Sequence, residues 1–171
     1  GIGRGIALEL ARRGSNVIIA DMDEESAKGV VTEIKAGGTQ SYYCETDVTQ
    51  QWSTDDMVET ALEEFGQLDV LVNNAGHSSH VRSIQFIGPE EWESVFKVNV
   101  EGVYRLTQSV IGSMIENGGG TVVTTSSYAA LHPGLLGGAA YSAAKSASYN
   151  MMRGINAELN AKGIRASTIL P

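Results

Sequence analysis

A tyrosine and a lysine four residues apart, Tyr141 and Lys145, are the side chains of this sequence best suited to proton transfer. At that spacing two side chains share one face of a helix, one turn apart. A tyrosine with an unperturbed pKa of about 10 is a poor base near neutral pH, and a neighbouring ammonium favours the phenolate. Upstream, Ser126 and Ser127 offer hydroxyls that could hold a carbonyl oxygen. These residues predict a general acid–base unit, although a surface pair or a lysine lying along an aromatic ring has the same spacing.

Glycines at the start of the chain predict a phosphate-binding turn. Gly1, Gly3 and Gly5 open a helical pattern, and Asp21 follows twenty residues after Gly1. Glycines at a helix start let a pyrophosphate approach backbone N–H groups. A carboxylate at the next strand end accepts hydrogen bonds from ribose hydroxyls and repels a 2′-phosphate, which favours NAD over NADP. Methyltransferases that bind S-adenosylmethionine use a similar turn, and these residues alone do not separate the two classes.

The elements that position these residues follow from apolar periodicity. Short apolar runs predict strands at 17–20, 41–44, 70–72, 121–125 and 165–170, and helical spacing predicts helices ending at Gly14 and spanning 24–36, 54–65, 89–115 and 142–161. The long helix is expected to break near Asn99. Strict alternation predicts one α/β domain over 1–171, a Rossmann-type doubly wound parallel sheet with helices on both faces. Ligands bind such sheets at the carboxyl ends of the strands.

Two further strand ends carry candidate ligand-binding residues. Asp47 and Val48 follow the strand at 41–44, where the carboxylate could meet an adenine amine or cap the next helix. Asn73-Asn74-Ala75-Gly76 follows the strand at 70–72 and suits either a close approach to a ligand or a plain turn. His77 and His80 come next, and we expect no metal there because a site would need further ligands.

The composition excludes several classes of protein. The chain has 171 residues and a net charge of −8, from 12 Lys and Arg against 20 Asp and Glu. That balance argues against binding to nucleic acid or to anionic membranes, both of which need a basic face. The single cysteine, Cys44, excludes an internal disulfide and suits the reducing cytoplasm. No apolar stretch approaches the roughly 18 residues of a membrane span.

Taken in order, these motifs resemble those of the short-chain dehydrogenases/reductases over essentially the whole chain. The segments that carry the resemblance are Gly1-Ile2-Gly3, Asn73-Asn74-Ala75-Gly76, Asn99 within Lys97-Val98-Asn99-Val100, Ser127 with Tyr141 and Lys145, and Ile169-Leu170-Pro171. The first is similar to the second half of the family's Thr-Gly-x-x-x-Gly-x-Gly turn. The resemblance implies an oxidoreductase that transfers hydride between NAD(H) and a secondary alcohol or ketone. A non-catalytic NAD-binding protein of the same fold is the alternative.

The resemblance also implies a role for each residue. Tyr141 transfers a proton to or from the substrate oxygen, Ser127 orients that oxygen, and Lys145 holds the nicotinamide ribose and favours the phenolate. Asn99 distorts its helix and helps hold a water that links Lys145 to solvent. The positions expected to bind the cofactor, from the residues and the resemblance together, are Gly1, Ile2, Gly3, Asp21, Asp47, Val48, Asn74, Ala75, Gly76, Tyr141, Lys145 and Pro171. His132 is expected to line the substrate pocket with Leu131, Leu135 and Leu136.

The sequence departs from the family pattern at both ends. The first strand and the part after Pro171 are absent, so we interpret the chain as an internal piece of a longer protein. In the family's strand order the absent strand is central, and without it the strands at 17–20 and 70–72 lose their common neighbour. We therefore expect the isolated piece to fold poorly and to be inactive. By resemblance, the helices at 100–116 and 142–161 form a homodimer or homotetramer interface.

Overall fold

The computed structural model describes residues 1–133 and 137–171, which form two compact units, Gly1–Gly66 and Gln67–Pro171. Each unit alternates helices with parallel strands, as predicted. Leu135 and Leu136, expected in a substrate pocket, lie outside the described residues. Within the described part of the chain, no helix is both long enough and apolar enough to cross a membrane.

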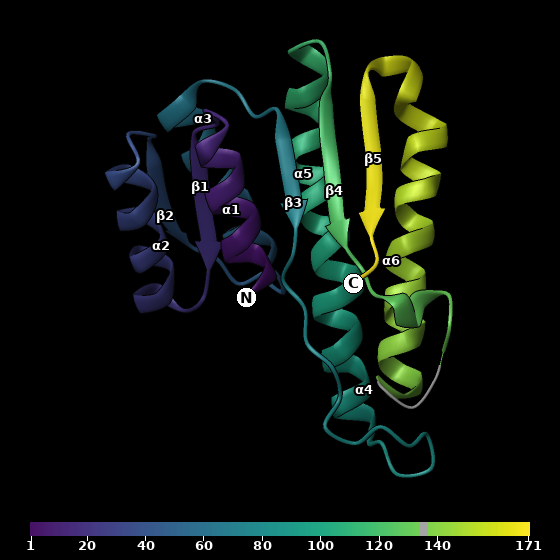
Figure 1. The fold of residues 1–171 in the computed structure, drawn as a ribbon. Coiled ribbons are helices and arrows are strands. Elements are labelled where there is room, and N and C mark those ends of the chain that lie inside the picture. The colour runs from purple at the N-terminus through teal and green to yellow at the C-terminus, as the bar shows by residue number, and fades with distance from the viewer. Residues whose placement is uncertain (134–136) are drawn as a thin grey trace. The chain divides into compact units, whose positions relative to one another are not determined.

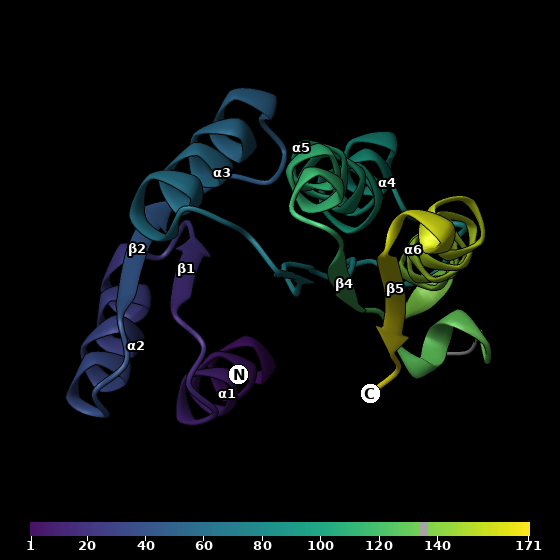
Figure 2. The same ribbon diagram turned by 90° about the horizontal axis from the view of Figure 1, so that it is seen from above.

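The first unit consists of two parallel strands with helices on both sides. Its elements are α1 (Ile2–Arg12), β1 (Val17–Asp21), α2 (Glu24–Ala36), β2 (Ser41–Glu45) and α3 (Gln51–Phe65). In the register of β1 and β2, Val17 lies opposite Ser41. Figures 1 and 2 show α1 and α2 on one side of this strand pair and α3 on the other. Gly66, in the left-handed conformation that glycine adopts without strain, ends α3.

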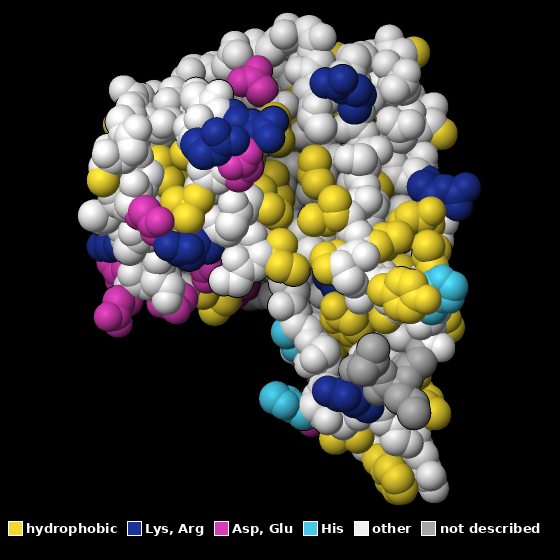
Figure 3. Space-filling view, in the orientation of Figure 1, with side chains coloured by type: hydrophobic (Ala, Val, Ile, Leu, Met, Phe, Trp, Pro, Cys, Tyr) yellow, Lys and Arg dark blue, Asp and Glu magenta, His cyan; other side chains and the backbone are white. Residues whose placement is uncertain are grey.

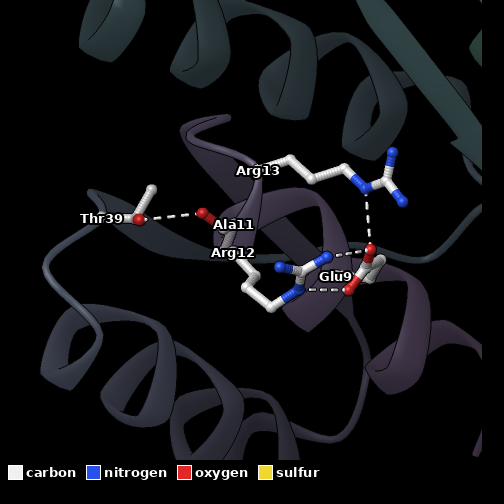
Figure 4. A network of polar contacts seen from close by, with 5 residues as sticks. All are labelled: Glu9, Ala11, Arg12, Arg13 and Thr39. Atoms are coloured by element: carbon white, nitrogen blue, oxygen red, sulfur yellow. Dashed lines mark hydrogen bonds and ion pairs between the residues drawn. The ribbon is translucent and has the colours of Figure 1, made fainter.

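Two arginines at the end of α1 share one glutamate (Figure 4). Glu9 accepts hydrogen bonds from Nε of Arg12 and from Nε of Arg13, both at 2.7 Å. The two guanidinium groups lower the pKa of Glu9 to about 2. The side chain of Thr39 donates to the carbonyl of Ala11 at 3.0 Å and ties the chain before β2 to the same helix end. The arginines are therefore helix C-terminal charges, which the helix dipole favours.

The second unit is a three-stranded parallel sheet in the order β3–β4–β5. Its elements are β3 (Val70–Asn73), α4 (Pro89–Phe96), a π-helical segment (Lys97–Gly102), α5 (Val103–Glu116), β4 (Gly120–Thr125), a 3-10 turn (Tyr128–Ala130), α6 (Gly138–Leu159), a second 3-10 turn (Asn160–Lys162) and β5 (Ile164–Ile169). Both α5 and α6 contact the sheet, and Figures 1 and 2 show them on the same face.

The two faces of this sheet differ in exposure. Leu71, Val122 and Ile164 point toward the helices and are buried. On the opposite face Val70 and Ile169 are 45% and 38% exposed, and hydrophobic side chains are visible over the sheet in Figure 3. The predicted cover of helices on both faces is thus present on one face of this sheet and on both faces of the β1–β2 pair.

The strands form two sheets, as expected for a chain in which the strands at 17–20 and 70–72 lack a common neighbour. β1 pairs with β2 and β3 pairs with β4, but β1 and β3 do not pair with each other. The prediction of a break near Asn99 is confirmed, because residues 97–102 form a π-helical segment. Element boundaries shift by a few residues: α3 begins at Gln51 and α6 at Gly138, earlier than predicted.

Candidate active site

Lys145 projects from α6 toward the carboxyl end of β4. Its side chain is 5% exposed, and Nζ donates a hydrogen bond to the carbonyl of Thr125, the last residue of β4, at 2.9 Å. Nζ also lies 5.7 Å from the centre of the Tyr141 ring. Burial lowers the pKa of Lys145 to about 8, because removing an ammonium from water disfavours its charged form. The predicted pairing of these two side chains on one helix face is present.

Asn99 is fully buried in the π-helical segment and points toward the same place. Its Nδ2 donates to the carbonyl oxygens of His77 and Val95, each at 2.8 Å. Among the described residues its Oδ1 has no hydrogen-bond partner. A buried oxygen without a partner is costly, and such groups are commonly satisfied by an ordered water or a ligand. π-helical turns themselves are frequent at functional sites.

The backbone of Gly76 lies next to both Asn99 and Lys145. A Cβ atom built at Gly76 would lie 2.7 Å from Oδ1 of Asn99 and 3.0 Å from Nζ of Lys145. Both polar atoms therefore converge on the backbone of Gly76, and a side chain there would displace them. The residue is a glycine for this close approach, which favours the ligand-site interpretation of the Asn-Asn-Ala-Gly segment over a plain turn.

The two asparagines before Gly76 hold the strand ends in place. Asn73 is buried, and its Nδ2 donates to the hydroxyls of Thr107 and Thr124 at 3.2 Å, which links β3 to α5 and β4. Asn74 accepts a hydrogen bond from the Thr125 hydroxyl at 3.2 Å through its Oδ1. Asn73 is thus a structural residue, whereas Asn74 and the exposed Ala75 lie next to Gly76 at the strand end.

The two candidate serines have different environments. Ser126 is 3% exposed, and its hydroxyl donates to the carbonyl of Lys145 at 2.8 Å. Ser127 is half-buried, and its Oγ accepts a hydrogen bond from the amide of Ala129 at 3.2 Å. That bond leaves the Ser127 proton available for another acceptor. Ser126 therefore holds α6 against β4, and Ser127 suits a substrate oxygen.

Tyr141 lies in the first turn of α6, with its ring against Gly137. A Cβ atom at Gly137 would lie 2.3 Å from Cδ1 of the tyrosine ring, so the ring occupies the space of a side chain at that position. Sequence reasoning missed Gly137, although a glycine four residues before a candidate tyrosine was the available signal. Pro171 accepts a hydrogen bond from the amide of Tyr128 at 2.9 Å, which places the end of the chain beside Ser127.

The remaining cofactor candidates belong to the first unit. Gly1 is the N-cap of α1, with no side-chain cap hydrogen bond. Ile2 is exposed and Gly3 is half-buried in its first turn. Asp21 is exposed at the end of β1, where one carboxylate oxygen accepts from the amide of Asp23 at 3.0 Å.

Asp47 and Val48 lie in the turn between β2 and α3. Oδ1 of Asp47 accepts from the amide of Thr49 at 2.8 Å, and its own amide donates to the Ser53 hydroxyl at 2.9 Å. Because the N-cap of α3 is Gln50, the alternative role of Asp47 as the helix cap is wrong. The residue stabilises the turn, and Val48 beside it is half-buried.

The structure thus brings Gly76, Asn99, Tyr141 and Lys145 together in the second unit, with Ser127 beside Pro171. Within residues 1–133 and 137–171, no group of three or more His, Cys, Asp or Glu side chains could hold a metal ion. The arrangement offers a phenol, a buried amine and an unpartnered amide oxygen at the carboxyl ends of parallel strands. It can move a proton to or from a ligand oxygen.

Comparisons with known proteins identify the family of the chain. The family model described as short chain dehydrogenase matches residues 1–171. The chain is 33% identical over its full length to a (2S)-[(R)-hydroxy(phenyl)methyl]succinyl-CoA dehydrogenase subunit of Thauera aromatica, of which it spans 68%. It is also 33% identical to a 2,5-dichloro-2,5-cyclohexadiene-1,4-diol dehydrogenase of Sphingobium indicum, with the same coverage of both chains.

A solved structure gives the same result for the fold. The structure of a 7α-hydroxysteroid dehydrogenase complexed with NADH and 7-oxo glycochenodeoxycholic acid has a TM-score of 0.94 and 30% sequence identity. The similarity covers 100% of this chain and 66% of that one. The family model, the curated relatives and the fold all lead to one conclusion. The chain belongs to the short-chain dehydrogenase family of oxidoreductases.

Proposed function

We propose that the protein carrying this chain is an NAD(H)-dependent oxidoreductase that interconverts a secondary alcohol and a ketone, with Tyr141 as the general acid–base. The observation that carries the proposal is the convergence of Nζ of Lys145 and Oδ1 of Asn99 on the backbone of Gly76, with the Tyr141 ring 5.7 Å from the amine. The NADH in the related 7α-hydroxysteroid dehydrogenase supports the choice of coenzyme class.

The residues of the chain fit a dinucleotide. Gly1, Ile2 and Gly3 at the start of α1 would receive the pyrophosphate, because a helix N-terminus presents free N–H groups. Asp21 would hold the adenosine ribose, and a carboxylate there disfavours a 2′-phosphate. The arginines of α1 do not offset that preference: Arg12 and Arg13 are paired with Glu9, and Arg4 is paired with Glu33 at 2.5 Å.

The other expected contacts lie at strand ends. Asp47 and Val48 would face the adenine, and Asn74, Ala75, Gly76 and Pro171 would line the nicotinamide end together with Tyr141 and Lys145. Among the described residues Oδ1 of Asn99 has no hydrogen-bond partner, and it lies close to the backbone of Gly76. A polar ligand or a water bound with it would donate a hydrogen bond to this oxygen. When bound, the nicotinamide supplies or accepts the hydride.

The chain's own residues would handle the proton and the oxygen. In the direction of alcohol oxidation, the phenolate oxygen of Tyr141 takes the hydroxyl proton of the substrate, and in reduction the phenol returns it to the carbonyl oxygen. The Ser127 hydroxyl donates to that oxygen in both directions and so orients it. The ammonium of Lys145 favours the phenolate electrostatically, and Asn99 would hold a water through which Lys145 exchanges protons with solvent.

A turnover assay of the complete enzyme tests the proposal. Absorbance of NADH is followed with a panel of steroids, sugars, polyols, cyclic alcohols and 3-oxoacyl thioesters. Tyr141→Phe should abolish turnover while NADH still binds, and Tyr149→Phe, the same change two turns along α6, should leave turnover unchanged. Turnover that survives in Tyr141→Phe would refute the assigned role. A protein that binds NADH and turns over no substrate would support the non-catalytic alternative.

The remaining features of the proposal concern the whole protein. We propose a homodimer or homotetramer that assembles through the helices at 100–116 and 142–161, where Tyr104 is 50% exposed. The net charge of −8 and the single Cys44 support a cytoplasmic protein that acts on small molecules, without nucleic acid or membrane partners. Light scattering of the complete enzyme measures the oligomeric state.

A further inference from the structure

The segment after β3 is attached to α4 at two points. Nε2 of His77 lies 3.1 Å from the carbonyl oxygen and 3.2 Å from the hydroxyl of Ser94. One turn earlier on α4, a carboxylate oxygen of Glu91 accepts from the backbone amides of His80 and Val81. Ser94 and Glu91 are three residues apart and therefore lie on one helix face. The His-x-x-His pattern, which has no role in the proposed chemistry, belongs to this attachment.

The first attachment leads directly to the acid–base group. The carbonyl of His77 accepts the hydrogen bond from Nδ2 of Asn99 at 2.8 Å. The second acceptor of that amide, the carbonyl of Val95, lies on the same helical stretch as Asn99. The Asn99 amide thus has one acceptor on its own helix and one on the segment after β3, and these two hydrogen bonds fix the plane of the amide. Its Oδ1 is then directed to Gly76, where it lies 2.7 Å from the position of a Cβ atom.

The His77 ring also contacts its own segment. Nδ1 lies 3.3 Å from the carbonyl oxygen of Ser78. A neutral imidazole donates from only one nitrogen, so only one of the two carbonyl contacts, Nε2 to Ser94 or Nδ1 to Ser78, is a hydrogen bond. The Nε2 contact to Ser94 is the shorter of the two and joins the ring to α4. The ring thereby links the segment after β3 to α4, and the His77 carbonyl is held beside this link.

We propose that His77 is a positioning residue for the acid–base group of Tyr141 and Lys145. Its side chain holds the His77 backbone carbonyl against α4, and this carbonyl fixes the orientation of the Asn99 amide toward Lys145. The inference rests on the proposed function for its kinetic consequences, but its structural part stands on the contacts alone. His77 touches neither the reacting oxygen nor the phenol in this account. It acts through Asn99.

Variants of the complete enzyme test this role. His77→Leu removes both ring nitrogens and should lower kcat about tenfold, the effect of one hydrogen bond of ordinary strength, with an unchanged KM for NADH. His77→Gln keeps a polar group near Ser94 and should restore part of the loss. The matched control is His80→Leu, in the same segment, because the His80 contact to Glu91 is made by its backbone and should survive the change.

A double-mutant cycle separates positioning from a general structural effect. If His77 acts through Asn99, His77→Leu should cause no further loss of kcat in an Asn99→Ala background. A wild-type kcat in His77→Leu, or losses that multiply in the double variant, would overturn the proposal. If His77→Leu does not fold, Ser94→Ala, which removes the hydroxyl contact to Nε2, replaces it in the same cycle.

Amide hydrogen exchange provides a readout that does not depend on turnover. In the substrate-free protein, His77→Leu should speed exchange in residues 97–102, and His80→Leu should not. Unchanged exchange in that segment would overturn the positioning role even if the enzyme is active. Faster exchange in a protein without dehydrogenase activity would instead support the attachment and refute the proposed function.

Discussion

Replacing Lys145 by methionine should make the protein more stable and inactive. The lysine is 5% exposed, and burial lowers its pKa from 10.5 to about 8. At about 1.4 kcal/mol per pKa unit, keeping the ammonium buried costs the folded state about 3 kcal/mol below pH 8. Methionine removes that cost and fills similar space, but it leaves the carbonyl of Thr125 without its hydrogen bond, a loss of about 1 kcal/mol. The net gain is about 2 kcal/mol.

The pH dependence of this gain follows from proton binding. Between pH 8 and 10.5 the unfolded lysine is protonated and the folded one is not, so the wild-type free energy of unfolding rises with pH across that window. Below pH 8 both states carry the proton, and the full cost is present. The advantage of Lys145→Met should therefore be largest near pH 6.5 and should disappear near pH 10.

Urea unfolding of the complete enzyme, without coenzyme, measures both effects at pH 6.5 and pH 10. Lys162→Met, which changes an exposed lysine, is the control and should alter the midpoint little at either pH. A Lys145→Met variant that is less stable than the wild type at pH 6.5, or whose advantage is the same at both pH values, would show that burial of the ammonium is not costly. NADH turnover by the variant should be lost at both pH values.

Substitutions of Gly76, Gly137 and Asp21 give three further predictions. Gly76→Ala should lower turnover at least about tenfold because its methyl group would meet Asn99 and Lys145 at 3.0 Å or less, as measured by kcat with NADH. Gly137→Ala should lower kcat by displacing the Tyr141 ring, whereas Gly154→Ala, where a Cβ atom has open space, should not; equal rates would contradict the contact. Asp21→Asn should raise the KM for NAD about tenfold, the loss of a charge-assisted hydrogen bond, and NADP kinetics should change less.

The sequence predicted the elements of this fold well because each has a local cause. The helix at 24–36 was predicted from its apolar spacing with the observed bounds, and the structure adds its N-cap, because Asp23 accepts from the amide of Ser26. The break near Asn99, expected within the long helical pattern at 89–115, is the π-helical segment. The division into two sheets was expected from the strand order that the resemblance implies, because periodicity alone does not report which strands are neighbours.

The site was predictable in its residue types and less so in its contacts. The Tyr141–Lys145 spacing follows from helix geometry, but the burial of Lys145 comes from tertiary packing. The resemblance selected Ser127 over Ser126, and the structure adds the physical reason, because the Ser126 hydroxyl donates to the carbonyl of Lys145. Gly137 was missed because a missing Cβ has meaning only once the tyrosine ring beside it is placed.

Two costly features meet at one point of the second unit, and this supports a binding site more strongly than any single motif. A desolvated ammonium on Lys145 and a buried oxygen on Asn99 that has no partner among the described residues each destabilise the folded chain. Both lie within about 3 Å of the same position at Gly76, which bears no side chain. A purely structural role would be served better by apolar residues of similar volume. A bound polar group offers both atoms a partner, so ligand binding there should recover stability that the free protein lacks.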